Sequence, residues 1–593
     1  KHDVRNLWWI VDYNRQSLDA TSADRMFERF DEIFKSCGWR VETLKHGKLL
    51  EAAFREKGGE ALRQWIDEAS NADYAALTYL GGKAWRERLL AEAPRTRAIL
   101  DRRNDDELQR LMTNLAGHDI ESMIEAFERC DDDRPTLFIA YTIKGFGLPF
   151  AGHKDNHAGL MNPTQMATLR ETMGVREGHE WEPLEGVGNN ALPGIKEVLE
   201  KARIAREKRA RSFGGITPAL AAPKGDEQST QAAFGRILLD LSKTGGDLAD
   251  RILTTSPDVT VSTNLGAWVN QRGLFRRSDT PDIFALAKIA SAQKWNGNNH
   301  GQHVELGIAE SNLFLMLAAA GLAGDLFDTR LFPIGTLYDP FIARGLDALN
   351  YACYQDARFL LVATPSGITL GPEGGAHQSI NPPLIALGQP GLRHYEPAFA
   401  DELAAMMEEG FRLIDDPKGE STYLRLSTRS IRQVERADDN WRQGALAGGY
   451  WLREPGVGAE AAIVAMGAII PEALAAFDRL VEDVPGLGLL VVTSPDLLHR
   501  GWTRAQAERW EGKRDQSHVE RLLSRLPPGA GLVTLADAAP ASLSWLGGVV
   551  GQRVVPLGVE KFGQTGNLAE LYAAYRLDGE AITQAVAELL LPQ

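Results

Sequence analysis

The chain has 593 residues, of which 44% are hydrophobic and 24% charged, and its formal net charge at pH 7 is −15. This length exceeds what one hydrophobic core serves, so two to four domains of ordinary globular composition are expected. The negative charge argues against nucleic acid as the main partner, because phosphate binding needs a clustered basic surface.

Short apolar runs alternate with amphipathic helix patterns along the whole chain. The predicted strands are residues 7–12, 136–142, 259–262, 359–364, 462–466 and 487–493. The predicted helices include residues 22–36, 313–322, 470–481 and 580–591. Unbroken apolar runs are typical of strands buried under helices on both sheet faces. The sequence therefore predicts an α/β fold with mostly parallel sheets.

Two shifts in composition divide the chain. The basic run 201–211 is interrupted by Ala, Ile and Glu, which indicates a solvated helix end rather than a binding patch. Residues 212–228 are rich in Gly, Ala and Pro and are typical of an interdomain linker. The polar stretch 432–446 precedes a new strand–helix series. We expect a first unit at 1–211, a second at 229–435 and a third at 436–593.

The cysteines and apolar runs indicate a cytoplasmic protein. Cys37, Cys130 and Cys353 lie far apart and form no metal-type pair, which favours a reducing compartment. The run 313–322 is shorter than the roughly 18 to 20 residues of a membrane span, and we expect no signal peptide. A buried strand at 7–12 is unusually close to a terminus, so we also expect residues to precede Lys1.

Polar groups follow the first two predicted strands. Asn14 and Gln16 come directly after 7–12, at the sheet edge where α/β proteins bind ligands. Their amide and carbonyl oxygens suit Mg²⁺, although a polar turn before a helix explains them equally well. Lys144 follows 136–142 and can hold an anion, and His153 and His157 stand in the Gly-flanked loop beyond it. That loop is as well explained by simple exposure as by function.

Further candidates lie in the second unit. Glu310 stands at the entrance of the apolar helix 313–322, where burial is costly without a partner and raises a carboxyl pKa. A favourable helix-dipole position is the alternative explanation. Tyr338 and Phe341 form an aromatic wall or simply pack in the core. Glu373 and His377, four residues apart in a Gly-rich loop, indicate a site more than a core.

In this order and spacing the clusters resemble the transketolase-like superfamily of thiamine-diphosphate enzymes. Within it they are most similar to the homodimeric bacterial decarboxylating component of pyruvate dehydrogenase. The stretches that carry the resemblance are NRQSLD at 14–19, TIKGFG at 142–147, GIAE at 307–310, EGGAH at 373–377 and HYEPAFA at 394–400. The resemblance implies two parallel-sheet cofactor-binding domains, of which the first is partial, and a C-terminal transketolase-type α/β domain.

The resemblance also implies a role for each candidate around the cofactor. Glu310 would be the acid that hydrogen-bonds the pyrimidine nitrogen of thiamine diphosphate and so assists deprotonation of the thiazolium carbon. An apolar helix entrance would keep this carboxyl protonated enough to donate. Tyr338 and Phe341 would pack around the pyrimidine ring, and Ile308 would be a further cofactor contact.

Metal and substrate roles follow in the same way. Asn14 and the Gln16 carbonyl would be Mg²⁺ ligands. His377 and Glu373 would face the substrate carbonyl, and His157, with His153 second to it, would handle the second substrate. Lys144 would support the active centre.

The sequence departs from the family pattern in three places. The metal-binding Gly-Asp-Gly motif, expected roughly 30 residues before Asn14, is absent because the sequence starts too late. Asn264 and Leu265 replace two adjacent acidic residues of the pyruvate-type enzymes. Arg429 stands where sugar-phosphate transketolases place an anion-binding arginine, or is a plain surface residue.

The function implied is decarboxylation of a pyruvate-like 2-oxo acid with acyl transfer to lipoamide. Transketolase-type transfer of a two-carbon ketol unit between sugar phosphates is the alternative, and a non-catalytic assembly subunit is another. The resemblance further implies a homodimer with its active sites at the subunit interface, and a lipoyl acyltransferase as a further partner.

Overall fold

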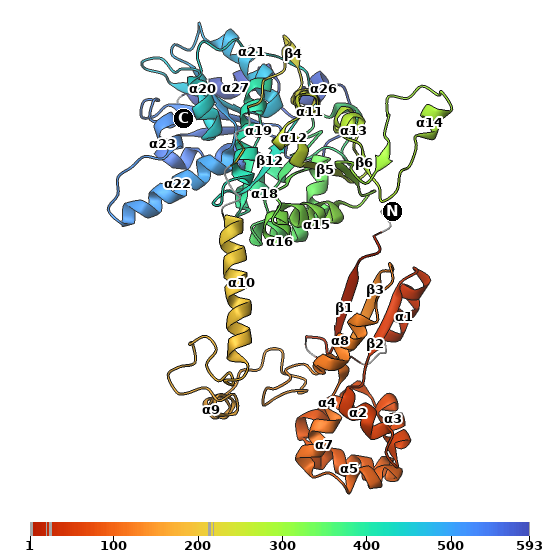
Figure 1. Ribbon diagram of the computed structural model, residues 1–593. Coiled ribbons are helices and arrows are strands. Elements are labelled where there is room, and N and C mark those ends of the chain that lie inside the picture. Colours follow the sequence, from red (N-terminus) through yellow and green to blue (C-terminus); the bar gives the residue numbers. More distant parts are fainter. Residues whose placement is uncertain (1–3, 19, 23–25, 211–214, 217–218, 592–593) are drawn as a thin grey trace. The chain divides into compact units, whose positions relative to one another are not determined.

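The computed structural model describes residues 4–18, 20–22, 26–210, 215–216 and 219–591. Contacts divide the chain into two compact units, residues 2–200 and 201–593 (Figure 1). The predicted divisions at 211 and 435 stay predictions, although each of the three larger sheets below lies inside one predicted domain.

The first unit contains a three-stranded parallel sheet in the order β1-β3-β2, with β1 (Trp8–Tyr13), β2 (Arg40–Leu44) and β3 (Thr136–Tyr141). The central strand β3 is buried along its whole length. The prediction of a buried first strand is wrong in part, because Trp8, Trp9 and Ile10 are about half exposed. β1 is an edge strand in the described sheet, so burial from its outer side is missing.

Most helices of the first unit lie between β2 and β3 in the sequence. The helices of this unit are α1 (Met26–Ser36), α2 (Lys48–Phe54), α3 (Gly59–Glu68), α4 (Asn71–Leu80), α5 (Gly82–Glu92), η1 (Pro94–Thr96), α6 (Arg97–Leu100), α7 (Asp105–Met112), η2 (Ala116–His118), α8 (Ile120–Glu128), α9 (Pro163–Thr172) and α10 (Leu192–Ala210), which ends beyond residue 200. The basic run 201–210 is helical in α10 and mostly exposed as far as it is described, as the sequence predicts.

The second unit begins with an eight-stranded sheet in which every pairing is parallel. Its order is β11-β12-β10-β9-β5-β8-β6-β7. The strands are β5 (Ile252–Ser256), β6 (Leu274–Phe275), β7 (Gly297–Asn298), β8 (His303–Glu305), β9 (Phe332–Leu337), β10 (Leu360–Ala363), β11 (Leu392–Tyr395) and β12 (Ser421–Arg425). The helices are α11 (Thr230–Thr244), α12 (Asp247–Arg251), α13 (Gly266–Arg272), α14 (Ile283–Leu286), α15 (Glu310–Gly321), α16 (Ala323–Phe327), η3 (Asp339–Gly345), α17 (Leu346–Tyr354), η4 (Gly371–Glu373), α18 (Pro382–Gly388) and α19 (Ala400–Ile414).

The strand predicted at 259–262 is wrong. The strand is β5, which ends at Ser256, and residues 259–262 belong to the turns that follow it. Asp258 has φ 68°, in the left-handed region that an extended strand does not enter. The β-branched Val259 and Val261 favour a strand by propensity, but the chain has already turned away from the sheet.

The remaining sheet has five strands in the order β14-β16-β15-β17-β18, of which only β14 is antiparallel. The strands are β14 (Gly449–Arg453), β15 (Ala461–Met466), β16 (Gly488–Val492), β17 (Gly531–Ala536) and β18 (Val554–Leu557). The helices are α20 (Asn440–Leu446), η5 (Gly467–Ile469), α21 (Ile470–Leu480), α22 (Pro495–Trp510), α23 (His518–Leu523), α24 (Ala541–Ser544), α25 (Gly547–Val550), α26 (Leu568–Ala574) and α27 (Gly579–Leu590). A short ribbon of β4 (Glu227–Gln228) and β13 (Ile431–Arg432) pairs the two ends of the middle region.

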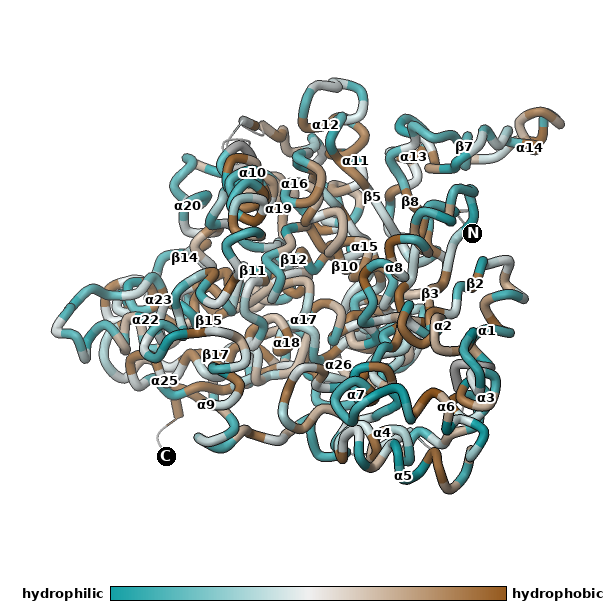
Figure 2. The backbone as a smooth tube through the Cα atoms, turned by 60° about the horizontal axis from the view of Figure 1, so that its bottom comes forward, coloured by the Kyte–Doolittle hydropathy of each residue, from teal (hydrophilic) through white to brown (hydrophobic). Residues whose placement is uncertain are grey.

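The two sheets of the second unit share one hydrophobic core. A single cluster of buried residues includes Leu360 and Val362 of β10 together with Ile463 of β15 and Leu535 of β17. These strands are coloured as hydrophobic in Figure 2. Burial on both faces is what their unbroken apolar sequences predict.

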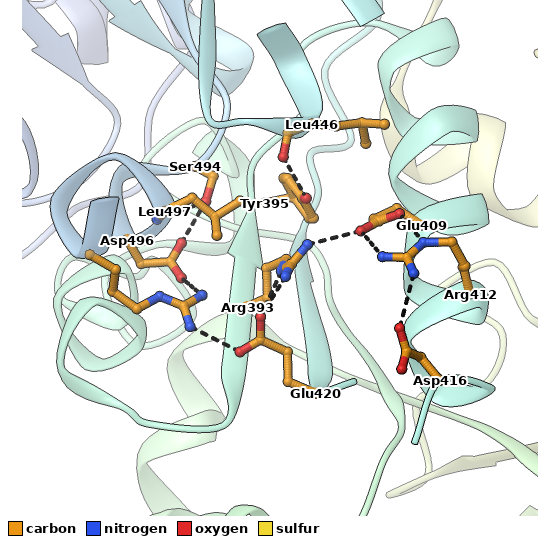
Figure 3. Close-up of polar contacts among 11 residues, drawn as sticks. Arg393, Tyr395, Glu409, Arg412, Asp416, Glu420, Leu446, Ser494, Asp496 and Leu497 are labelled. Carbon is orange, nitrogen blue, oxygen red and sulfur yellow. Dashed lines mark hydrogen bonds and ion pairs between the residues drawn. The ribbon is translucent and has the colours of Figure 1, made fainter. Parts of the chain in front are cut away.

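A series of ion pairs links the regions of the two sheets (Figure 3). Arg393 of β11 pairs with Glu409 of α19 at 2.9 Å and with Glu420 at 2.7 Å. Glu420 also accepts from Arg500 of α22 at 2.9 Å, and Arg500 holds Asp496 at 2.8 Å. Charged side chains from both sheet regions are therefore linked in one network.

Two further features of the described residues concern their apolar helices and their cysteines. Among the described helices, none combines the length and apolar character that a membrane crossing requires. Cys37, Cys130 and Cys353 are free thiols, of which Cys37 is exposed.

A buried histidine in β11 makes stability depend on pH. The His394 side chain is fully buried, and neither ring nitrogen has a hydrogen-bond partner among the described residues. Its ring stacks on Tyr423 with centroids 4.7 Å apart. Burial, with a contribution from the Arg425 charge, lowers the pKa of His394 to about 3. The folded chain therefore holds this imidazole neutral.

We expect His394→Phe to reduce the loss of stability in acid. An unfolded histidine takes up its proton near pH 6.5, while folded His394 takes it up near pH 3, so the unfolded state binds more protons between these values. Stability from this residue is complete above pH 6.5 and falls as pH drops, by about 1.4 kcal/mol per pH unit. Thermal unfolding measured from pH 8 to pH 5 should show a shallower slope in the variant. Equal slopes in both proteins would contradict this.

Candidate functional site

The candidate residues of the second unit lie at the carboxyl ends of neighbouring parallel strands. Glu310 follows β8, Tyr338 and Phe341 follow β9, and His377 follows β10. The strand order β10-β9-β5-β8 brings these ends to one sheet edge, where α/β folds bind ligands.

Glu310 is the first residue of α15, and its side chain is 8% exposed. The predicted burial is confirmed. Its Oε1 accepts from Arg344 Nη1 at 2.7 Å, which supplies the partner that a buried carboxylate needs. The sequence does not point to this arginine, because the two residues are 34 positions apart. The predicted protonation of Glu310 stays a prediction.

The backbone before Glu310 is fixed by a second buried acid. Glu305, the last residue of β8, accepts from the backbone N–H of Asp258 at 2.8 Å and of Gly307 at 3.1 Å, and from the Thr260 hydroxyl at 2.7 Å. Burial acts to raise the pKa of Glu305, but these hydrogen bonds and the neighbouring His303 lower it to about 2. The ionised Glu305 therefore fixes the loop between β8 and α15, and so the position of Glu310.

An aromatic group stands beside the acid. The rings of Tyr338 and Phe341 are nearly parallel, with 11° between their planes and 6.0 Å between centroids. His377 meets both rings edge-on, at 5.8 Å from Tyr338 and 5.6 Å from Phe341. All three side chains are only partly buried, and Phe341 also packs against the hydrophobic core of this sheet.

A cluster of buried polar residues lies next to the aromatic residues and holds their loops in place. Asp339, between the two aromatic residues, is fully buried and accepts from the hydroxyls of Tyr423 and Ser379 and from Arg425 Nε, the last at 2.8 Å. Ser379 lies two residues beyond His377, so Asp339 connects the aromatic pair to the histidine loop. These hydrogen bonds explain how the loop of Tyr338 and Phe341 and the loop of His377 stay next to each other.

Arg425, at the end of β12, is the centre of the buried cluster. It binds Asp339, then Glu396 Oε1 at 2.8 Å, the Ser379 hydroxyl at 3.1 Å and the Asp537 carbonyl at 3.0 Å. Burial raises the pKa of Glu396 to about 7, although Arg425 opposes the shift. Because Asp537 follows β17, the cluster also ties the site to the five-stranded sheet.

The other predicted residues of this unit differ in exposure. Glu373 in η4 and Ile308 before α15 are exposed. Asn264 is exposed and donates to the Gln231 carbonyl at 3.2 Å, while Leu265 is buried. Arg429 is bound to Glu472 by two hydrogen bonds of 2.6 and 2.8 Å, so it is no plain surface residue and its guanidinium is already engaged.

In the first unit, the ends of β1 and β3 bring Asn14, Gln16 and Lys144 around one small cavity. Asn14 Oδ1 accepts from the Gln16 backbone N–H at 3.0 Å, and Gln16 Nε2 donates to the Gly152 carbonyl at 3.0 Å. Lys144 Nζ donates to the Ser17 carbonyl at 3.0 Å. The Gln16 side-chain oxygen is buried and has no partner among the described residues. Of the stretch 14–19, Asp19 lies outside the described residues.

The two loop histidines differ in their surroundings. His153 Nδ1 accepts from the Asp155 backbone N–H at 3.1 Å, and its ring lies edge-on to Tyr79. His157 is exposed. A further histidine that the sequence did not single out, His118, accepts from the Ile143 N–H at 2.8 Å and stacks on Phe146. Its position between Gly117 and a helix-capping Asp119 is the only local signal.

Comparisons with known proteins support the resemblance drawn from the motifs. A family model for the pyruvate dehydrogenase E1 component middle domain matches residues 212–429. The chain is 25% identical to the pyruvate dehydrogenase E1 component of Mycolicibacterium smegmatis over 98% of its own length and 66% of that protein. It is 25% identical to the same component of Pseudomonas aeruginosa over 100% of its length and 69% of that protein.

Solved structures agree on the fold. The transketolase of Campylobacter jejuni superposes with a TM-score of 0.64 at 16% identity, covering 98% of this chain and 73% of that one. The transketolase of Leishmania mexicana gives a TM-score of 0.62 at 16% identity, covering 99% and 72%. The likeness to transketolase-like thiamine-diphosphate enzymes and the predicted α/β fold are confirmed. The chain spans about two thirds of the length of its curated relatives.

Proposed function

We propose that this chain belongs to an enzyme that uses thiamine diphosphate to decarboxylate a pyruvate-like 2-oxo acid and passes the acyl group to lipoamide. One observation carries the proposal: a buried carboxylate, Glu310, next to the stacked Tyr338 and Phe341 at the carboxyl ends of parallel strands. The name shared by the relatives in Mycolicibacterium smegmatis and Pseudomonas aeruginosa supports the choice of substrate.

The residues present fit the cofactor and its metal. A flat, hydrogen-bonding pyrimidine suits an acid beside an aromatic face, so Glu310, Tyr338, Phe341 and Ile308 would hold it. Asn14 and the Gln16 backbone carbonyl would hold Mg²⁺, and the unpartnered Gln16 side-chain oxygen supports a polar site for a hard cation there. When bound, thiamine diphosphate supplies an electron sink at its thiazolium carbon.

The chain's own side chains would orient the substrate. His377, held edge-on against two rings, presents an imidazole beside the acid and can donate to a carbonyl oxygen. Glu373 is exposed and four residues away, so its carboxylate can reach the same space from solvent. In the first unit, Lys144 would hold an anionic group, while His157 and, second to it, His153 would meet the acceptor.

The assembly belongs to the same proposal. In this family the cofactor lies between domains of two chains, so we propose a homodimer with active sites at the subunit interface and a lipoyl acyltransferase as further partner. A reducing, cytoplasmic setting is consistent with the three free cysteines. Transketolase activity is less well supported, because Arg429, its expected anion-binding residue, is engaged by Glu472.

Two parallel assays test the proposal. The full-length protein is incubated with thiamine diphosphate, Mg²⁺, pyruvate and an artificial electron acceptor, and separately with xylulose phosphate and ribose phosphate. Turnover in the first assay alone is the expected result, and turnover in the second alone would establish the transketolase alternative. Absence of both, with no cofactor binding by calorimetry, would leave a non-catalytic assembly subunit.

A further inference from the structure

Arg344 fills the space between the acid and the aromatic wall. Its Nη1 donates to Glu310 Oε1 at 2.7 Å, and its Cζ lies 3.8 Å from the centroid of the Phe341 ring. The guanidinium thus makes two contacts at once, a charged hydrogen bond and a cation–π contact.

These are the two contacts that an aminopyrimidine would make in the same place. Both groups are flat and delocalised, and both would lie against an aromatic ring with one in-plane hydrogen bond to Glu310. The direction of that bond differs, because the guanidinium donates to Glu310 whereas the pyrimidine nitrogen would accept from it. We propose that the Arg344 guanidinium takes the position that the pyrimidine of thiamine diphosphate would take, and that it must swing out before the cofactor can bind. This inference rests on the proposed function.

The surroundings of Arg344 allow such a movement. Its side chain is 52% exposed, whereas the Glu310 side chain is 8% exposed. Its backbone is fixed, because the Arg344 carbonyl accepts from the Ser311 hydroxyl at 3.0 Å. A rotation of the side chain alone can therefore free Glu310 and the face of Phe341 while η3 stays in place.

The competition should be modest in size. A half-exposed ion pair and a cation–π contact are each weak in water. Because both contacts of Arg344 must break before the cofactor binds, we expect them to reduce cofactor affinity by about threefold to thirtyfold. With this weaker affinity, a higher concentration of thiamine diphosphate is needed to fill the site.

The test uses Arg344→Ala in the full-length chain, with Arg412→Ala as matched control. Arg412 is 53% exposed and pairs with Glu409 at 2.7 Å and with Asp416 at 3.2 Å, neither of which is a candidate site residue (Figure 3). The first readout needs no cofactor: labelling of Glu310 by a water-soluble carbodiimide, located by peptide mass spectrometry. The second is the affinity and association rate of thiamine diphosphate with Mg²⁺, by calorimetry and stopped-flow fluorescence.

We expect Arg344→Ala to raise Glu310 labelling several-fold and to tighten cofactor binding by about threefold to thirtyfold, with Arg412→Ala like the wild type. Unchanged labelling would mean that the pair does not shield Glu310, and unchanged or weaker binding would make Arg344 a bystander or a cofactor anchor. Either result overturns the inference. Binding by neither wild type nor variant would overturn the proposed function, and this inference with it.

Discussion

Replacing Arg425 with leucine is expected to reduce the free energy of unfolding of the second unit by about 3 to 5 kcal/mol. The substitution removes the only cation in contact with two buried acids in this cluster, Asp339 and Glu396, among the described residues. Both acids would then stay buried with no cation beside them, which costs far more than the lost attraction. Denaturant unfolding followed by circular dichroism measures the change.

Two further variants separate charge burial from simple loss of packing. Arg425→Leu combined with Asp339→Asn and Glu396→Gln should recover part of the loss, because positions 339 and 396 then carry no charge. Arg412→Ala removes a half-exposed arginine whose partner Glu409 keeps its ion pair with Arg393, and it should cost no more than about 1 kcal/mol. A loss below about 1 kcal/mol for Arg425→Leu would refute the idea that this cluster supports the fold.

Glu310→Ala is expected to slow proton exchange at the thiazolium carbon of bound thiamine diphosphate by about a hundredfold or more. The proposed function gives Glu310 the hydrogen bond to the pyrimidine that promotes this exchange. Hydrogen–deuterium exchange followed by nuclear magnetic resonance measures the rate, with cofactor occupancy checked by calorimetry.

The exposed Glu373 provides the contrast. Because it is proposed to face the substrate and not the cofactor, Glu373→Ala should slow decarboxylation of pyruvate but leave the exchange rate within about threefold of the wild type. Exchange that persists in Glu310→Ala at the wild-type rate would remove Glu310 from its proposed role, whatever its effect on turnover.

Local sequence patterns predict the parts of this fold whose causes are local. The apolar run at 136–142 becomes the buried strand β3, and the run at 462–466 becomes β15, because burial on both faces requires such residues. The strand expected at 259–262 fails, since Asp258 turns the chain first. The strand propensity of residues 259–262 does not reveal that the chain turns just before them.

The sequence predicts which residues belong to the candidate site, but it does not predict which residues they contact. The burial of Glu310 follows from the apolar helix beside it, yet its partner Arg344 comes from a different loop. Asp339 stands between two residues that the motifs single out, but only the structure connects it to Arg425, 86 positions away. Contacts of this kind depend on tertiary packing, which no local pattern records.

The edge strand β1 has a consequence for how the chain behaves in solution. In the described sheet its outer side has no neighbouring strand, and Trp8, Trp9 and Ile10 are half exposed. A strand of this kind is a template for pairing with another strand, including one from a second molecule. At high concentration the chain should therefore self-associate and precipitate through this strand, even though its net charge of −15 opposes it.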